Sequence, residues 1–130
     1  MTFDPQALFA NLTEKERVYG HHSAEGRAMR MLSRALNGWS TENLSGRDVL
    51  VMCDQAIDDW LKTRLNISAW SATGLNQLLA SALAANLLTR EELRRLQMVH
   101  DLCGGLTSPT VDEVNGALTS AIEIVERHWS

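Results

Sequence analysis

The feature that most constrains the fold is a long stretch without charge, residues 65–89, which contains no Asp, Glu, Lys or Arg. Alanine and leucine dominate its second half, and both are good helix formers. A helix on the surface of a globular domain normally carries charged side chains on its outer face. The stretch therefore predicts a helix buried on most sides, with a partner subunit supplying part of the cover. Its Ser, Asn and Gln residues argue against a membrane span.

The other segments show helical periodicity. Apolar side chains recur every three to four residues over 24–37, 45–66 and 110–129, each time with a polar side opposite. Asn37-Gly38 is expected to stop the first of these helices. Ser45 is expected to cap the second, because a serine hydroxyl can accept a hydrogen bond from the first turn.

Two further helix starts have local signals. Thr89 followed by Glu92 is the pattern of a capping box, which predicts a helix from residue 90 to Gly104-Gly105. Asp4 before Pro5 indicates an N-terminal helix. β-branched residues never form a run, so strands have little support. The sequence predicts an all-α fold, an up-and-down bundle of five to six helices, in one domain over residues 1–130.

Composition narrows the setting and the partners. The net charge of −4 does not favour nucleic-acid binding by the molecule as a whole. Only a local basic patch would support such binding. The 2 cysteines lie far apart and outside any CxxC motif, which indicates a reduced, cytoplasmic setting. The first residues do not have the pattern of a signal peptide, and no stretch of about 18 apolar residues predicts a membrane helix.

A polar group on the helix over 90–103 is the main candidate for chemistry. His100 lies at the edge of an apolar stripe, and Arg94 and Arg95 precede it. A histidine can move protons near neutral pH, and an arginine can hold a phosphate. Asp54 and Asp58, one turn apart, are interpreted as solubilising carboxylates on the outer side of their helix.

Metal and cofactor sites are not predicted. His21-His22 and Glu25 resemble half of a metal site, but the sequence has no Glu-x-x-His of the kind that di-iron bundles use. Too few ligands are present for a metal, and no glycine-rich loop for a phosphate cofactor accompanies the arginines.

The order of helices over residues 47–129 resembles the HEPN superfamily of bacterial helical bundles. The resemblance is carried by the segments QAIDDWLKTRL, LNQLLASALAANLLTREELRRLQMVHDL and EVNGALTSAIEIVERHW, in that order. Active members of that superfamily carry an Arg-Asn-x-x-x-His motif at the end of the helix that matches residues 90–103. The resemblance implies that this motif lies at a dimer interface and cleaves RNA without a metal.

This chain departs from the motif at every chemical position. Cys103 stands in place of Arg, Gly104 in place of Asn and Ser108 in place of His. None of the three supplies a fixed positive charge or a proton shuttle near neutral pH. The resemblance therefore implies a degenerate member without the nuclease chemistry.

The function expected from the sequence is a non-catalytic module that acts through homodimerisation and partner binding. Some HEPN proteins operate with a nucleotidyltransferase in toxin–antitoxin or stress systems, and the resemblance implies a partner of that kind. One alternative is an RNA- or nucleotide-processing enzyme that uses His100 with Arg94 or Arg95. Another is a structural subunit of a larger complex.

The dimer seam is expected in the charge-free stretch. A small bundle has a limited interior, and closed two-fold pairing is the commonest way to cover an apolar patch. The residues expected near this seam are Trp70, Leu75, Leu79 and Leu83.

Overall fold

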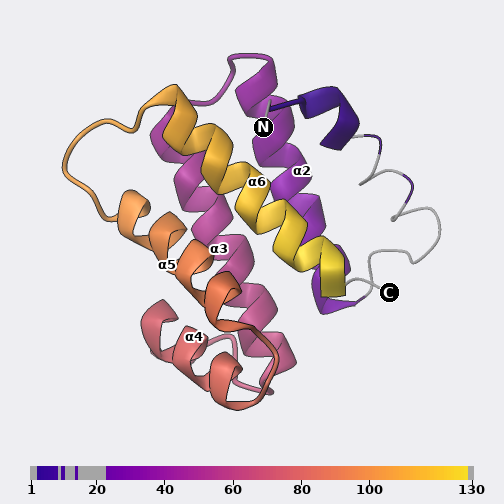
Figure 1. Ribbon diagram of the computed structural model, residues 1–130, viewed down its shortest axis with the longest axis vertical. Helices are drawn as coiled ribbons and strands as arrows, with labels where there is room; N and C mark the ends of the chain where they lie inside the picture. Colours follow the sequence, from indigo (N-terminus) through magenta and orange to yellow (C-terminus); the bar gives the residue numbers. More distant parts are fainter. Residues whose placement is uncertain (1–2, 9, 11–13, 15–22, 129–130) are drawn as a thin grey trace.

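The computed structural model describes residues 3–8, 10, 14 and 23–128. They form an all-helical bundle (Figure 1). The helices are, in chain order, α2 (Ala24–Ser40), α3 (Gly46–Arg64), α4 (Leu75–Ala84), α5 (Arg90–Cys103) and α6 (Val111–His128). A helical turn at residues 5–8 precedes them. The described residues contain no strand, so the predicted all-α class is confirmed.

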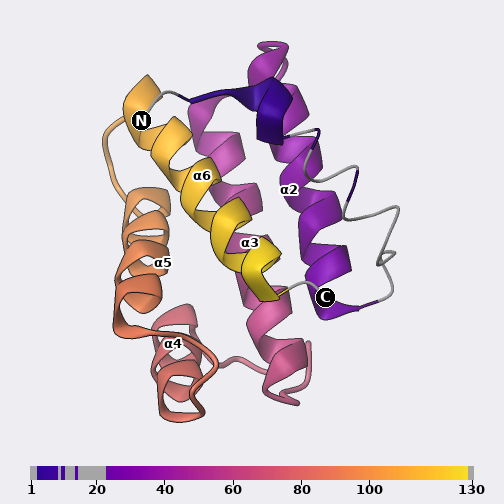
Figure 2. The same ribbon diagram turned by 45° about the vertical axis from the view of Figure 1, so that its right-hand side comes forward.

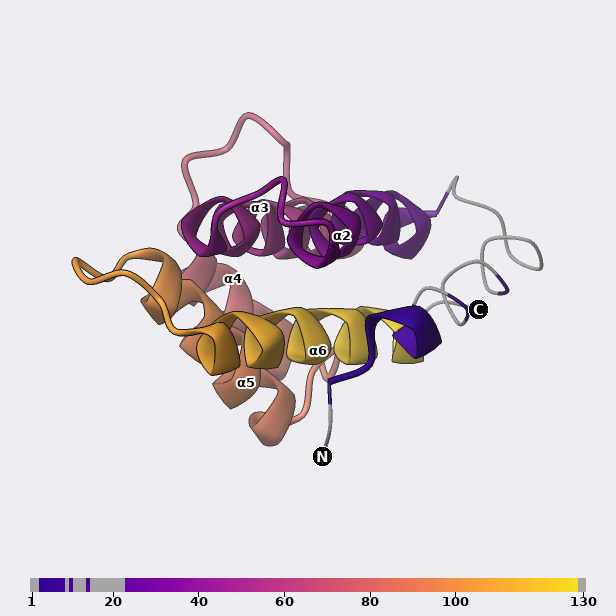
Figure 3. The same ribbon diagram turned by 90° about the horizontal axis from the view of Figure 1, so that it is seen from above.

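Helix α3 is the centre of the bundle, because it packs against α2, α4, α5 and α6. The four long helices run alternately up and down, as predicted, and α4 lies at the lower end against α3 and α5 (Figures 1 and 2). Seen from above, α2 and α3 form one layer, and α6 with α5 forms the second (Figure 3). One continuous apolar core lies between the layers, and the fully buried Trp60 of α3 is part of it.

The helix starts follow the predicted side-chain signals. The Ser45 hydroxyl accepts from the backbone N–H of Asp48 at 3.1 Å. Thr89 and Glu92 form both bonds of a capping box, at 3.2 and 2.9 Å. Asp4 accepts from the N–H of residue 6 at 3.1 Å. These bonds satisfy N–H groups that have no partner inside the helix, which is why they fix where each helix begins.

The predicted stop of α2 at Asn37-Gly38 is wrong, since the helix continues to Ser40. Gly38 lies inside it because Leu44, just beyond the turn, packs onto its backbone. A Cβ at Gly38 would lie 2.3 Å from Leu44 Cδ1. The chain turns instead at Glu42, whose φ of 60° is left-handed. The absence of a side chain at Gly38 is therefore required by the packing of Leu44 and not by a turn.

The charge-free stretch folds differently from the expectation of a helix buried on most sides. Only residues 75–84 of it form a helix, α4, and α4 lies at the edge of the bundle. One side of α4 is buried, while Asn76, Gln77, Ala80 and Ser81 on its other side are exposed. The outer face of α4 therefore consists of uncharged polar residues and alanines, and it is exposed.

Candidate functional site

The imidazole of His100 on α5 meets the carboxylate of Asp54 on α3. Their Nδ1 and Oδ1 atoms are 2.8 Å apart, and both side chains are partly exposed. A carboxylate at Nδ1 fixes the orientation of an imidazole and leaves Nε2 as the atom that can exchange a proton with a substrate. Asp54, which was interpreted as solubilising, is therefore the partner of the candidate histidine.

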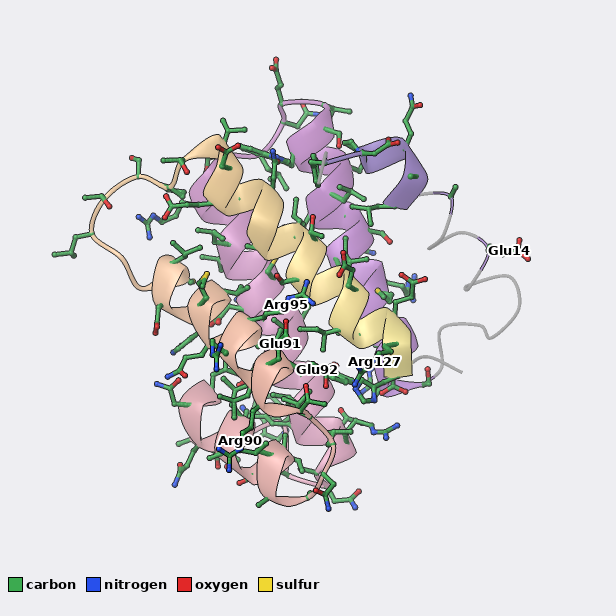
Figure 4. All side chains as sticks on the ribbon, in the orientation of Figure 1. Glu14, Arg90, Glu91, Glu92, Arg95 and Arg127 are labelled. Carbon is green, nitrogen blue, oxygen red and sulfur yellow. The ribbon has the colours of Figure 1, made fainter. Side chains whose placement is uncertain are left out.

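The arginines predicted to act with His100 do not share its surroundings. Arg95 reaches from α5 toward α6 (Figure 4) and donates to Ser120 Oγ at 3.2 Å and to Glu123 Oε2 at 3.1 Å. Arg94 is exposed. Residues five apart on a helix differ by about 140° in direction, so Arg95 and His100 face different neighbours. The predicted group of three is not assembled in this structure.

The guanidinium nearest the degenerate motif belongs to Arg47, in the first turn of α3. It donates to the carbonyl oxygens of Cys103 at 2.9 Å and Thr107 at 2.6 Å. These bonds hold the end of α5 and the loop that carries Ser108, which is exposed. Gly104 is the C-cap of α5. Arg47 therefore holds backbone here, with both Nη1 and Nη2 bonded to carbonyl oxygens.

The two thiols are poor nucleophiles. Burial raises the pKa of Cys53 to about 12, with smaller contributions from Asp54 and Cys103. Partial burial, followed by the Asp54 carboxylate, also raises the pKa of the Cys103 thiol, and Arg47 opposes this only in part. Because the thiolate is the reactive form, these surroundings keep both cysteines protonated near neutral pH.

Two buried carboxylates were not anticipated as a group. Glu25 of α2 accepts from the indole N–H of Trp60 at 2.5 Å, and Arg64 lies 3.4 Å from its other oxygen. Glu92 of α5, already in the capping box, pairs with Arg127 of α6 at 2.9 Å. For the burial of either carboxylate the sequence contains no signal beyond a Glu in the first turn of a helix. Burial of such a residue depends on which other helices pack against that turn.

His128 of α6 contacts Trp60, the hydrogen-bond donor to Glu25, and lies close to Glu92. Its ring packs against Trp60, with the centroids 5.4 Å apart, and its Nε2 lies 3.7 Å from Glu92 Oε2. Both of these atoms are buried and without a hydrogen-bond partner. The side chain of His128 is mostly buried, at 18% exposure. Glu92 and Arg127 mark this end of the bundle in Figure 4.

A metal centre finds no support in the part of the chain that the structure describes, where no three His, Cys, Asp or Glu residues are placed to hold an ion. The His21-His22 pair lies outside the described residues. Glu25, the third member of that candidate group, is engaged with Trp60.

The outer side of α6 is hollowed along both of its flanks. The hollow toward α5 has a volume of about 380 Å³, and Met98, Leu102 and Ala117 give it an apolar lining. The hollow toward the N-terminal residues is about 760 Å³. Met98 of α5 and Val111 at the start of α6 are 60% and 62% exposed, and Leu106 on the α5–α6 loop is fully exposed. Large apolar side chains are thus concentrated where α5 meets α6.

The predicted seam residues divide into two groups. Leu75 and Leu79 are buried in the chain's own core, at 5% and 1% exposure, so they are not available to a partner. They face inward because α4 packs against α3 and α5 with this side. Trp70 is 95% exposed and Leu83 is partly exposed, so these two stay accessible.

Comparison of the sequence with known family models gave no match, and comparisons with curated proteins and with solved structures gave none either. Among the helices in the described ranges, none combines the length and the apolar character that a membrane span requires.

Proposed function

We propose that this protein is a non-catalytic, HEPN-like association module that forms a homodimer through the side of the bundle where α5 meets α6. The observation that carries the proposal is the pair Met98 and Val111, each more than half exposed; Met98 lines the apolar hollow between α5 and α6, and Val111 directly precedes Asp112 and Glu113 of its lining. Burying the part of each side chain that is still exposed contributes about 1–2 kcal/mol to association. Exposed apolar groups that gather around a hollow are typical of protein-binding surfaces.

The polar groups near this side support association better than catalysis. Arg95 is engaged with Ser120 and Glu123, and Arg47 is engaged with two backbone carbonyls. These bonds fix the direction of both guanidinium groups toward protein atoms, which leaves them less free to turn toward a phosphate. The resemblance of residues 47–129 to the HEPN superfamily adds support, because that superfamily places the matching loop at a dimer interface.

The experiment is a measurement of solution mass by light scattering over a tenfold range of concentration. We expect a mass of twice the 14.5 kDa chain. Met98→Asp should shift the protein toward monomer, whereas Trp70→Asp should not. Both side chains are largely exposed, so both variants should keep the helical content of the parent.

Two outcomes would overturn this proposal. One is a monomeric mass at every concentration. The other is dissociation by Trp70→Asp but not by Met98→Asp, which would put the seam beside α4 and not beside α6.

A second candidate function has one specific observation in its favour, the 2.8 Å contact between His100 and Asp54. This pair is the acid–base arrangement that an RNA- or nucleotide-processing enzyme needs. It would act without Arg94 and Arg95, which face elsewhere. Cleavage assays distinguish it from the association module.

A further inference from the structure

Two side-chain atoms in the described part of the chain are buried and have no hydrogen-bond partner, and they are neighbours. They are Oε2 of Glu92 on α5 and Nε2 of His128 in the last turn of α6, which lie 3.7 Å apart. A buried polar atom without a partner lowers stability, and such atoms are rare in folded proteins. Two of them this close need only a small movement to satisfy each other.

The two carboxylate oxygens of Glu92 have different surroundings. Oε1 accepts from the backbone N–H of Thr89 at 2.9 Å and lies 2.9 Å from Nη2 of Arg127. Oε2 accepts no hydrogen bond within the described residues. The side chain of Glu92 is only 6% exposed, so water has little access to this second oxygen. The capping box and Arg127 thus hold the carboxylate by Oε1 and leave Oε2 for His128.

The imidazole of His128 is kept beside Glu92 by its contact with Trp60. The two rings are 5.4 Å apart between centroids and tilted by 46°, and the indole is tied in turn to Glu25 of α2. Nδ1 of His128 is not among the buried atoms without a partner, and the side chain is 18% exposed. When Nε2 carries the hydrogen that points toward Glu92, Nδ1 is the nitrogen that can take up a second proton.

The charges around this end of the bundle favour that second proton. Glu91, Glu92, Arg95 and Arg127 gather where α5 meets α6 (Figure 4). The charged groups from the helices packed here are Glu25 of α2, Arg64 of α3, Glu91, Glu92 and Arg95 of α5, and Glu123 and Arg127 of α6. These are four carboxylates against three guanidinium groups, so the set is one positive charge short while His128 is neutral. The C-terminal end of a helix also favours a cation, and an opposite charge within reach offsets the cost of burying one.

We propose that Glu92 and His128 form a pH-sensitive clasp, which fastens the last turn of α6 to α5 in mildly acidic solution. Protonated His128 donates from Nε2 to Oε2, and the separation of 3.7 Å closes to the roughly 2.7–2.9 Å of a charge-assisted hydrogen bond. An unfolded histidine takes up its proton at about pH 6.5. Because the clasp makes the folded chain bind this proton more tightly, its contribution to stability is complete below about pH 6.5 and is lost as the pH rises above that value. The clasp does not depend on the proposed homodimer.

A double-mutant cycle at two pH values tests the clasp. Glu92→Gln keeps a side chain that can complete a capping box, and His128→Phe keeps an aromatic ring on Trp60. The coupling between the two changes should be about tenfold in the unfolding equilibrium constant at about pH 5.5, and about twofold at about pH 8. Urea denaturation of the four proteins measures it, and the other histidines cancel because all four proteins contain them. A coupling that is equal at the two pH values, or absent at both, would overturn the proposal.

The imidazole resonances of His128 give a second measurement on the folded protein, and their absence from His128→Phe assigns them. Glu92→Gln should move the midpoint of their titration to lower pH by about one pH unit, because the carboxylate that holds the proton is gone. The matched control is Glu91→Gln, since Glu91 adjoins Glu92 but is exposed, and it should move the midpoint much less. Equal movement in the two variants, or none in Glu92→Gln, would contradict the clasp.

The single variant His128→Phe decides the matter if Glu92→Gln fails to fold. The parent should exceed His128→Phe in free energy of unfolding by more at about pH 5.5 than at about pH 8, because only the parent gains the clasp in acid. A difference that stays constant or narrows in acid would overturn the proposal.

Discussion

The indole nitrogen of Trp60 donates to the buried carboxylate of Glu25, with 2.5 Å between Nε1 and Oε2. Trp60→Phe removes that donor and some buried volume, so we expect the free energy of unfolding to fall by about 2–4 kcal/mol. Urea denaturation measures it. In a Glu25→Gln background, Trp60→Phe should lower the free energy of unfolding by less. The side chain that loses its hydrogen-bond donor is then a neutral amide and not a buried carboxylate. Equal costs in the two backgrounds would mean that the bond contributes nothing specific.

Two glycines inside helices should respond to alanine in opposite directions. Gly38→Ala forces a Cβ against Leu44, so we expect a loss of about 1–3 kcal/mol. Gly116→Ala meets open space, so the better helix propensity of alanine should stabilise the monomer by about 0.5–1 kcal/mol. Thermal unfolding at a low protein concentration, where any dimer is dissociated, compares them. Two changes of the same sign would contradict the packing of Leu44 on Gly38.

The buried thiol of Cys53 should make the protein less stable in alkali. Burial raises its pKa from 9.0 to about 12, so between these values the unfolded chain loses this proton and the folded chain keeps it. The contribution is therefore complete below pH 9 and is lost as the pH rises toward 12, with about 1.4 kcal/mol gone at pH 10.

Cys53→Ala isolates this effect. The variant should lose about 1–3 kcal/mol at pH 8 through the missing volume. Since alanine does not titrate, the difference from the parent should narrow at pH 10. Urea titrations at both pH values measure it, and a constant difference would show that the thiol ionises equally in both states.

Ribonuclease activity of the HEPN type is not expected, because Cys103, Gly104 and Ser108 replace the motif residues. Incubation with single-stranded and structured RNA should give no products that end in a 2′,3′-cyclic phosphate. Cleavage that disappears in both His100→Ala and Asp54→Asn would establish the enzyme alternative instead. Ser81→Ala, distant in sequence from both, serves as the control for contaminating nuclease.

The structural features that the sequence predicted best are those that depend only on residues a few positions apart. Ser45 and Thr89 mark helix starts through bonds that span three positions, and such bonds need no tertiary context. Periodicity likewise predicted the helices and their inner sides. Gly38 misled because its partner Leu44 lies across a turn, so a packing contact had the same sequence signature as a helix stop.

The site was less predictable because it depends on how the helices are rotated against each other. His100 and Asp54 are separated by 46 positions, and no local pattern says which side of α5 meets α3. The burial of Leu79 depends in the same way on the docking of α4. The lack of charge in residues 65–89 is compatible with two arrangements. A partner subunit could cover the helix, or the helix could expose a face of alanine and neutral polar residues, and composition does not distinguish the two.

The contacts of α6 with Trp60 and Glu92 carry a consequence for synthesis. A ribosome releases the chain amino end first, so Glu25, Trp60 and Glu92 emerge well before Arg127 and His128, which come at the end of the last described helix. Until then Glu92 lacks the cation that it pairs with in the finished bundle, and one face of Trp60 is without its histidine neighbour. The nascent helices α2 to α5 should therefore stay loosely packed at this end, and a chain stalled before α6 should be open to proteases there.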